Sequence, residues 1–211
     1  MATSVFASTA PARSYPVLLD LVPPISSSRL WAIPLLGIGI KSIITIPHAI
    51  YLYVLSLVVG ATQLIVWIPV LFTGRYPEWA FGLNVGTLRL SSRLFAYLLG
   101  LTDVYPSFSM EKVNEGDLDI ERPETSSRLW AIPFLGIFIK STILIPHAIV
   151  LYALYIALGI SHLVLWIPVL FTGRYPGWGF SFTVGTIRWT ERVYAYVYGL
   201  TDKYPPFSMS S

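Results

Sequence analysis

An internal repeat of 99 residues constrains this chain more than any other feature of its sequence. Residues 27–110 align without a gap with residues 126–209, and about 54 of the 84 aligned positions are identical. This identity is far above chance for any composition, so the chain is a tandem duplication of one structural unit. The repeat divides the chain into an N-terminal extension (1–26), a first unit (27–110), an acidic linker (111–125) and a second unit (126–211).

The composition is that of a membrane protein. Hydrophobic residues make up 55% of the chain, charged residues only 12%, and the mean hydropathy is +0.65. Soluble domains carry about twice this charged fraction, which argues against a self-contained soluble enzyme. A net charge of +3 is too small to indicate nucleic-acid binding. The absence of cysteine excludes disulfides, thiolate metal sites and a cysteine nucleophile.

Charge is distributed unevenly between the linker and the units. Six of the eleven acidic residues lie in the linker, so the rest of the chain holds 12 basic and 5 acidic residues. A basic membrane protein favours anionic headgroups on the cytoplasmic side. The N-terminal extension has no apolar core of signal-peptide length, so we expect the later apolar segments to direct insertion.

Each unit contains one long uncharged run. Residues 47–72 would span about 39 Å as a helix, more than the hydrocarbon core of about 30 Å. Pro47 suits the first turn of this helix, and Gly74 suits the position just after its end. The second unit repeats the run over residues 146–171.

The segment after the apolar run has helical periodicity and two arginines. Apolar residues recur from Trp79 to Leu101 at helical spacing, while Arg89 and Arg93 lie one turn apart on another face. This pattern predicts an amphipathic helix at the membrane interface. The predicted fold is therefore an all-α integral membrane protein of two tandem homologous units, each with a long apolar helical segment followed by an amphipathic interfacial helix.

The repeat also bears on topology, because near-identical units should insert in the same orientation. If each unit crossed the membrane once, the second would be inverted, against the positive-inside tendency. A re-entrant hairpin that turns near Gly60, and near Gly159 in the second unit, keeps both sets of arginines on one side. A single kinked span, or a spanning helix that turns Arg89 and Arg93 into the protein, are the alternatives.

Four motifs in each unit carry a family resemblance. In the first unit they are Ile-Pro-His (46–48), Phe-Thr-Gly-Arg-Tyr-Pro (72–77), Val-Gly-Thr-Leu-Arg (85–89) and Thr-Asp-x-Tyr-Pro-x-Phe (102–108). The ordered set resembles a family of bacterial integral membrane proteins described only as a domain of unknown function. The resemblance implies a bacterial cytoplasmic membrane, multi-pass or re-entrant, and it implies no reaction, cofactor or substrate.

The repeated histidines are candidate cofactor ligands. His48 and His147 occupy equivalent apolar positions, where a neutral imidazole can ligate haem iron or the magnesium of a chlorophyll. The alternative is a hydrogen bond to a carbonyl group or a lipid headgroup. We favour this alternative, because no carboxylate or second repeated histidine accompanies either copy, and His162 aligns with Gln63.

The repeated arginines are candidate contacts for anionic lipid headgroups or acidic groups of a partner, since guanidinium groups match phosphate oxygens. The candidates are Arg75, Arg89, Arg93, Arg174, Arg188 and Arg192. Arg75 and Arg174 follow the capping glycines, where a cation also stabilises a helix end. We expect the other four to contact headgroups generally, with a dedicated lipid pocket as the alternative. Asp103 and Asp202 are expected to pair with an arginine or to cap a turn.

Enzymatic function is not indicated by any motif. The sequence has no phosphate-binding glycine loop, no metal-ligand spacing and no nucleophile elbow. We therefore expect a non-enzymatic membrane scaffold or accessory subunit of a larger assembly, which binds membrane lipids and protein partners. A pigment- or haem-associated subunit is one alternative. A lipid or small-solute carrier is another, because internal repeats often build transporters.

Overall fold

The computed structural model describes residues 15–210, apart from residues 31–32, 34–35 and 133–134. The first unit contains α1 (Leu36–Ile44), α2 (Ile46–Thr73) and α3 (Glu78–Leu98). The second contains the short 3-10 helix η2 (Arg128–Ala131), α4 (Leu135–Ile143), α5 (Ile145–Thr172) and α6 (Gly177–Val197). The two units therefore have the same order of helices, as the repeat predicts.

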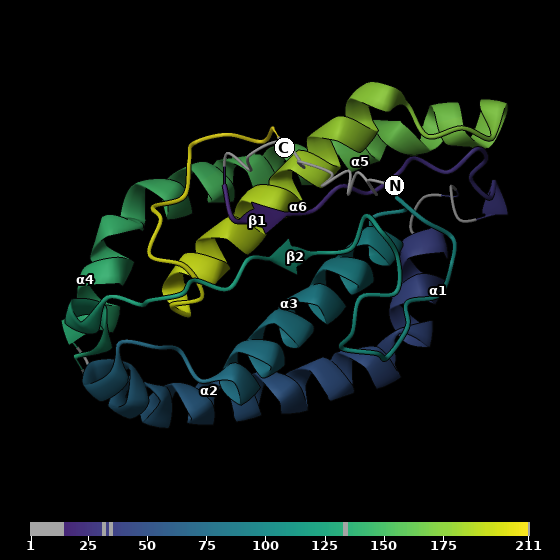
Figure 1. Cartoon of the computed structure of the whole chain (residues 1–211). Coiled ribbons are helices and arrows are strands. Elements are labelled where there is room, and N and C mark those ends of the chain that lie inside the picture. Colours follow the sequence, from purple (N-terminus) through teal and green to yellow (C-terminus); the bar gives the residue numbers. More distant parts are fainter. Residues whose placement is uncertain (1–14, 31–32, 34–35, 133–134, 211) are drawn as a thin grey trace, which may run out of the picture.

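The helices form a frame around an inner pair. In Figure 1, α1, α2, α4 and α5 follow the outline of the molecule, and α3 and α6 lie inside it. The inner helices pack against each other and against the long helix of their own unit. Strands β1 (Val17–Leu18) and β2 (Asp119–Ile120) pair in front of them.

The long helices begin and end where the sequence predicts. Pro47 lies in the first turn of α2, and Gly74 ends the helix with a left-handed φ of 70° and an N–H bonded to the Val70 carbonyl. The predicted hairpin turn near Gly60 and Gly159 is wrong, because both glycines lie inside unbroken 28-residue helices. A single glycine costs a helix only about 1 kcal/mol, and no turn residue stands beside it.

The helix predicted at the membrane interface is an inner helix of the protein. Of the 21 residues in α3, 13 are buried, and α6 has the same pattern. The polar face that carries Arg89 and Arg93 turns toward the linker rather than outward. The helical periodicity correctly predicted a helix here. The predicted position at the membrane interface is wrong, because the linker covers the polar face that we expected to be exposed.

The repeat extends further upstream than the sequence alignment indicates. Residues 15–26 correspond to residues 114–125 at the same spacing of 99, with Leu19 matching Leu118 and Asp20 matching Asp119. We call these two segments the first and second straps. They pair as antiparallel strands, with Val17 opposite Ile120. Residues 15–26 of the N-terminal extension and residues 114–125 of the acidic linker are therefore equivalent structural elements.

Reciprocal contacts relate the units by an approximate two-fold rotation. The Ser27 amide donates to the Gly173 carbonyl, and the Ser126 amide donates to the Gly74 carbonyl, both at 2.8 Å. Such mutual pairing of equivalent groups is the mark of two-fold symmetry. The first strap packs on α6 of the second unit, while the second strap contacts α3 of the first unit. The straps are thus exchanged between the units.

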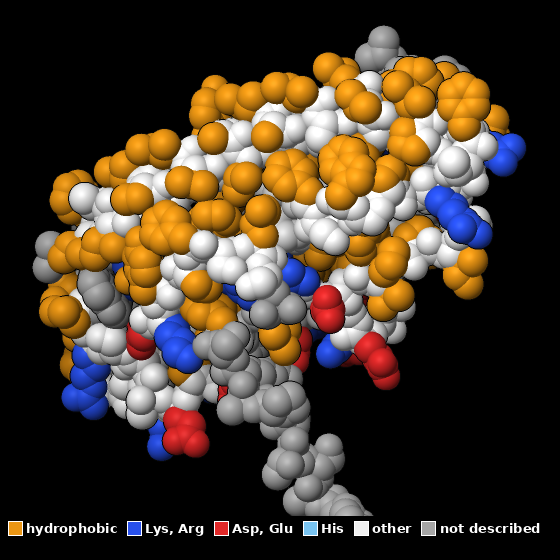
Figure 2. Space-filling view, turned by 90° about the horizontal axis from the view of Figure 1, so that it is seen from above, with side chains coloured by type: hydrophobic (Ala, Val, Ile, Leu, Met, Phe, Trp, Pro, Cys, Tyr) orange, Lys and Arg blue, Asp and Glu red, His pale blue; other side chains and the backbone are white. Residues whose placement is uncertain are grey.

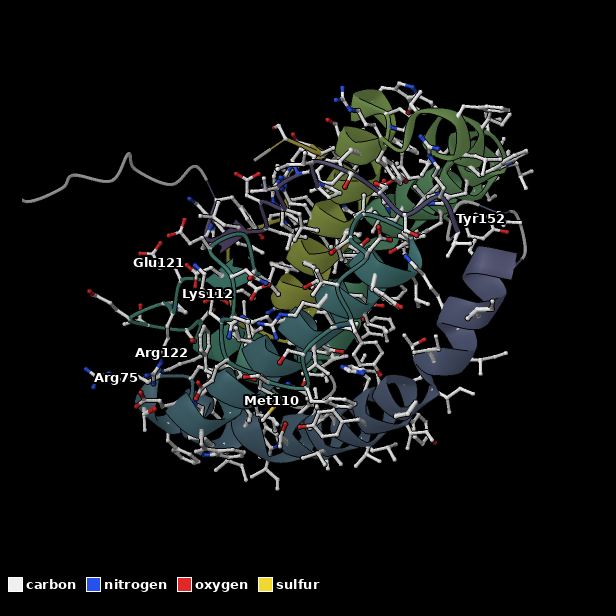
Figure 3. All side chains as sticks on the ribbon, turned by 90° about the vertical axis from the view of Figure 1, so that its right-hand side faces the viewer. Arg75, Met110, Lys112, Glu121, Arg122 and Tyr152 are labelled. Carbon is white, nitrogen blue, oxygen red and sulfur yellow. The ribbon has the colours of Figure 1, made fainter. Side chains whose placement is uncertain are left out.

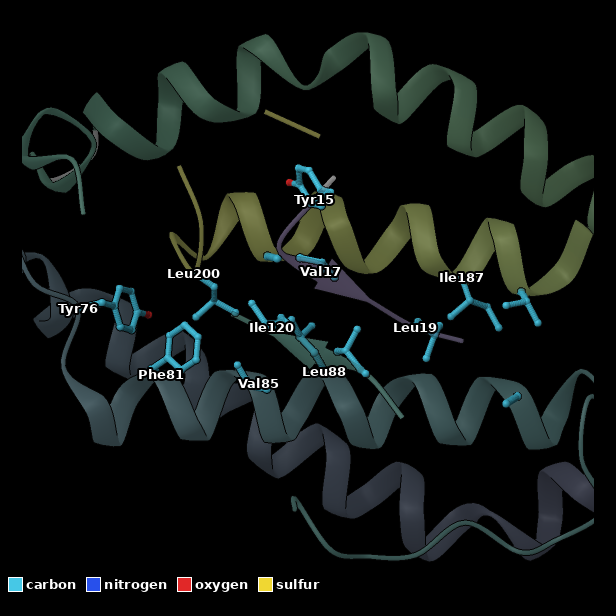
Figure 4. Close-up of a cluster of buried hydrophobic side chains, with 14 of the residues drawn as sticks. Tyr15, Val17, Leu19, Tyr76, Phe81, Val85, Leu88, Ile120, Ile187 and Leu200 are labelled. Atoms are coloured by element: carbon cyan, nitrogen blue, oxygen red, sulfur yellow. The ribbon is translucent and has the colours of Figure 1, made fainter. Parts of the chain in front are cut away.

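The hydrophobic core lies between the inner helices and the straps. Figure 4 shows side chains of α3 and α6 converging on the paired strands. The core includes Val17, Leu19, Ala80, Leu101, Leu118, Ala195 and Leu200, all almost inaccessible to solvent. The straps therefore supply part of the core that joins the two units.

The long helices leave most of their apolar surface outside the core. Both α2 and α5 are long and apolar enough to cross a membrane by length and composition. Exposed positions include Leu64 at 67% and Phe72 at 73%. In Figure 2, apolar side chains cover the upper part of the view, whereas charged side chains gather toward its lower edge and its right-hand end.

Candidate functional site

The inner arginine of the first unit is part of a buried ion pair. Two bonds join Arg93 to the Asp117 carboxylate of the second strap, from Nη2 to Oδ2 at 2.6 Å and from Nε to Oδ1 at 3.1 Å. Both side chains are more than 90% buried. Burial raises the pKa of Asp117, but Arg93 and the amides of Val113 and Asn114 outweigh burial and lower it.

The other inner arginines bind carbonyl groups of the chain. Arg89 donates to Leu118 and Met110 at 2.8 Å each. In the second unit the equivalent bonds run from Arg188 to Leu19 and Met209, both at 2.7 Å. Arg192 donates to the carbonyls of Ser208 and Ser210 at 3.2 and 2.9 Å. The four arginines predicted to contact headgroups thus face the chain itself, and a lipid phosphate would have to displace these bonds.

Glycine in the Val-Gly-Thr motif permits the close approach on which these bonds depend. A Cβ added at Gly86 would lie 2.6 Å from the Cβ of Met110, and one at Gly185 would lie 2.6 Å from the Cβ of Met209. Each methionine carbonyl accepts a bond from an inner arginine. The repeated glycine therefore lets the last residues of each repeat lie directly on the inner helix.

The remaining two predicted arginines are exposed at the ends of the long helices. Arg75 points away from the helices at the end of α2 (Figure 3), and Arg174 is exposed at the end of α5. Each has a second exposed arginine from the other unit nearby, because Arg128 lies against Gly74 and Arg29 lies against Gly173. These pairs form two basic ends. The sequence alone did not show that Arg29 and Arg128 belong to them.

The repeated histidines are packed inside the protein. The His48 ring stacks on Phe108 at 3.6 Å between centroids, and its Nδ1 lies 3.0 Å from the Tyr105 hydroxyl. His147 stacks on Phe207 in the same way. The Nε2 atoms of both rings are buried and have no hydrogen-bond partner among the described residues.

A cofactor would need room at these histidines. Haem or chlorophyll ligation requires an open position in front of a ring nitrogen. The Nδ1 of His147 already accepts a bond from Trp189 Nε1 at 2.9 Å, and its Nε2 is enclosed. Within the described residues, no group of three histidine or acidic side chains is placed to hold a metal ion.

A buried lysine stands at the junction of each short helix with its inner helix. Lys41 donates to the Tyr97 carbonyl at 3.0 Å and lies 3.5 Å from the Asp103 carboxylate. The same carboxylate accepts a bond from the Ser28 amide at 2.6 Å. Asp103 was predicted to pair with an arginine or cap a turn, and the structure instead pairs it with lysine. In the second unit, burial lowers the pKa of Lys140 to about 8, against the opposing charge of Asp202.

Each of these lysines lines a pocket between the two units. The Lys41 pocket has a volume of about 600 Å³ and lies between α1, the end of α3, and α5 of the other unit. The Lys140 pocket has a volume of about 390 Å³ and uses the equivalent elements with the units exchanged. The pockets differ at several repeated positions, among them His162 in the first and Gln63 in the second. Sequence reasoning missed both pockets, because their walls come from segments far apart in the chain.

A buried glutamate in α6 has no counterpart in α3. Glu191 is 2% exposed and accepts a bond from Ser91 of α3 at 3.3 Å, while its other oxygen has no partner within the described part of the chain. Burial raises its pKa to about 8. The aligned residue of the first unit is Ser92, so the replacement of a small polar residue by an acid was the available sequence signal.

The comparisons with known proteins identify one family. The model of a domain of unknown function, DUF4389, matches the chain twice, over residues 36–110 and 135–209. No curated protein and no solved structure matches the chain. The two matched segments coincide with the three helices of each unit and the chain that follows them.

Proposed function

Because this chain belongs to the DUF4389 family of unknown function, we propose its function from its own surfaces. The protein is a non-enzymatic scaffold or accessory subunit embedded in a bacterial cytoplasmic membrane, with its apolar frame in lipid and its straps in the cytoplasm. The observation that carries the proposal is the separation of an exposed apolar frame from a charged strap face. An apolar surface of this extent marks a membrane or protein interface rather than a surface in water.

The approximate two-fold axis supports one orientation. The paired strands lie on this axis, and the straps carry the exposed acids Asp20, Glu115, Glu121 and Glu124, with exposed Glu111 just before the second strap. An axis in the plane of the membrane would place these charges inside the hydrocarbon, at a cost of several kcal/mol. An axis along the membrane normal leaves the straps in water and gives both units the same depth. Arg75 and Arg174 then face the same side.

The basic ends support contact with anionic lipid. Arg75 and Arg128 lie at one end of the frame, and Arg174 and Arg29 at the other. Each arginine near an anionic surface contributes about 1 kcal/mol. Headgroup contact is therefore assigned to the exposed end arginines and not to the inner ones.

Labelling of single cysteines tests the orientation in this cysteine-free chain. Glu78 and Gly177 are equivalent exposed positions at the starts of α3 and α6. In sealed membranes, Glu78→Cys and Gly177→Cys should react with an impermeant maleimide from the cytoplasmic side at similar rates. Labelling of the two positions from opposite sides would refute the proposed orientation.

The scaffold part of the proposal is supported by small exposed residues on α2. Ser56 and Gly60 lie one turn apart on the exposed surface, and a Cβ at Gly60 would meet nothing within 4 Å. Small residues allow another membrane helix to approach closely. We expect partners to copurify in mild detergent, and Gly60→Leu to reduce their recovery severalfold. Gly82→Leu, at an open exposed site on α3, is the matched control; equal recovery with both variants would refute docking on α2.

A further inference from the structure

The Lys41 pocket has the size and lining of a small-molecule site. Its volume of about 600 Å³ lies within the range of about 300 to 1,000 Å³ typical of ligand pockets. Most of its wall is apolar and comes from both units, with Leu98 and Leu99 on one side and Leu158 and Trp166 on the other. A pocket of this kind suits a hydrocarbon chain.

The pocket is continuous with the exposed apolar surface. Leu163 of α5 lines the pocket and is 72% exposed, and Ile38 of α1 lines it and is 52% exposed. Both residues belong at once to the pocket wall and to the outside of the frame. A hydrocarbon chain lying against the frame can therefore enter without crossing a polar surface.

One buried hydroxyl in the pocket has no hydrogen-bond partner among the described residues. Ser27 lines the pocket, is more than 90% buried, and its Oγ makes no hydrogen bond to any described residue. Buried polar groups are nearly always satisfied, and an unsatisfied one costs about 1–3 kcal/mol. The same arrangement occurs again in the Lys140 pocket, where the equivalent Ser126 hydroxyl is buried and has no partner in the described part of the chain. Its repetition in both pockets points to a ligand group rather than to an accident of packing.

The charge around this hydroxyl favours an uncharged ligand. Lys41 and Asp103 are the charged side chains among the described lining residues, and their ion pair leaves no net charge. The Ser28 amide, next to Ser27, bonds to Asp103, so the ion pair and the free hydroxyl lie at the same end of the pocket. The ring nitrogens of His162, on the opposite wall, lie at 2.8 and 3.1 Å from two backbone carbonyls. A carboxylate or phosphate would have no counter-charge here, and burying it unpaired is costly.

We propose that the Lys41 pocket binds one acyl chain of an uncharged acyl ester, whose ester carbonyl accepts a hydrogen bond from Ser27 Oγ. The chain lies among the apolar side chains of α3 and α5, and the polar end remains beside Ser27. The ester is either a free acylglycerol or the ester-linked chain of a membrane phospholipid whose charged headgroup stays outside. This site goes beyond the scaffold role and does not depend on it, since binding is measured in detergent without partners.

Filling the pocket tests its assignment. The probe is monopalmitoylglycerol, added to the purified full chain in mild detergent and measured by native mass spectrometry. Gly159 lines the pocket, and a Cβ there meets nothing within 4 Å. Gly159→Phe should weaken binding at least about tenfold, because it occupies the space of several methylene groups. Gly60→Phe, at the equivalent open position of α2, is the matched control and should bind like the wild type.

A second pair of variants tests the Ser27 hydroxyl. Its result does not depend on whether the Gly159→Phe variant folds. Ser27→Ala should weaken monopalmitoylglycerol binding about fivefold, the effect of one hydrogen bond. Ser26→Ala removes a neighbouring exposed hydroxyl and should have no effect. Equal binding by both alanine variants would overturn the role of Ser27, and unchanged binding by Gly159→Phe would overturn the site itself.

Two further experiments test the charge of the ligand and identify its source. Ionised palmitate should bind more weakly than monopalmitoylglycerol, and tighter binding of palmitate would overturn the uncharged class. Phospholipid that copurifies and is displaced by monopalmitoylglycerol would identify the membrane as the source. Copurification of a free acylglycerol, with no phospholipid in the pocket, would identify a free acylglycerol as the source. Absence of binding in every arm would refute the proposal while leaving the membrane orientation untouched.

Discussion

Replacing Arg93 with methionine should strongly destabilise the fold. The substitution keeps much of the side-chain volume but leaves the Asp117 carboxylate buried without its charge partner. The backbone amides of Val113 and Asn114 still bind the carboxylate. Removing one partner of a buried ion pair costs about 3–5 kcal/mol. For a chain of this length, that loss lowers the unfolding temperature by about 10 °C.

The assay is thermal unfolding of purified protein in mild detergent, followed by circular dichroism. Arg75→Met is the control for loss of an arginine, and because Arg75 is exposed its effect should stay within about 0.5 kcal/mol. The double variant Arg93→Met with Asp117→Asn should recover part of the stability, since no buried charge remains. An Arg93→Met variant that unfolds within about 1 kcal/mol of the wild type, or a double variant no better than the single one, would refute the reasoning.

The same ion pair predicts a pH dependence in acid. The pKa of Asp117 is lowered in the folded state, so its stabilising effect is present above the ordinary carboxyl pKa of about 4 and is lost as the pH falls through the lowered value. Asp117→Asn should remove this part of the acid sensitivity. Identical acid unfolding curves for the wild type and Asp117→Asn would contradict the assignment.

Three further features are tested by separate variants. Because burial raises the pKa of Glu191 to about 8, stability should fall as the pH rises from about 4.5 to 8, by up to about 5 kcal/mol; Glu191→Gln should abolish this slope in melts at several pH values, and an unchanged slope would refute it. Gly74→Ala should cost about 1–2 kcal/mol in thermal unfolding because φ is 70° there, whereas Gly60→Ala, inside the same helix, should be neutral or stabilising. His147→Phe should cost about 1–3 kcal/mol by leaving Trp189 Nε1 unpaired, without loss of any visible absorbance band; loss of such a band would restore the pigment alternative.

Local signals in the sequence predicted the long helices well. Proline in the first turn and glycine after the last turn are local signals for the start and the end of a helix. Both lie at the predicted positions of α2. The hairpin prediction failed because it relied on Gly60 alone, without the additional turn residues that a reversal inside a membrane needs. A single glycine inside a long apolar run, with no other turn residue beside it, remains helical.

Interactions between distant segments escaped sequence reasoning. We predicted that the helix face with Arg89 and Arg93 is exposed, because periodicity identifies a polar face. Periodicity does not show that a distant segment, here the second strap, covers this face. The straps were missed as a repeat, since few of their residues are identical and their equivalence lies in strand pairing. The Lys41 pocket combines residues more than 100 positions apart, and no pattern within one unit predicts such a wall.

The exchange of straps links the duplication to assembly. A chain with one unit and one strap has no second inner helix to receive that strap, so it satisfies these contacts only as a homodimer of crossed chains. The stability of such a dimer depends on protein concentration. Joining the two copies in one polypeptide makes the crossing intramolecular and replaces bulk concentration by an effective concentration set by the linker. It also frees each copy to diverge. Differences between the halves, such as Glu191 opposite Ser92 and His162 opposite Gln63, give the pseudo-symmetric protein two unequal sides.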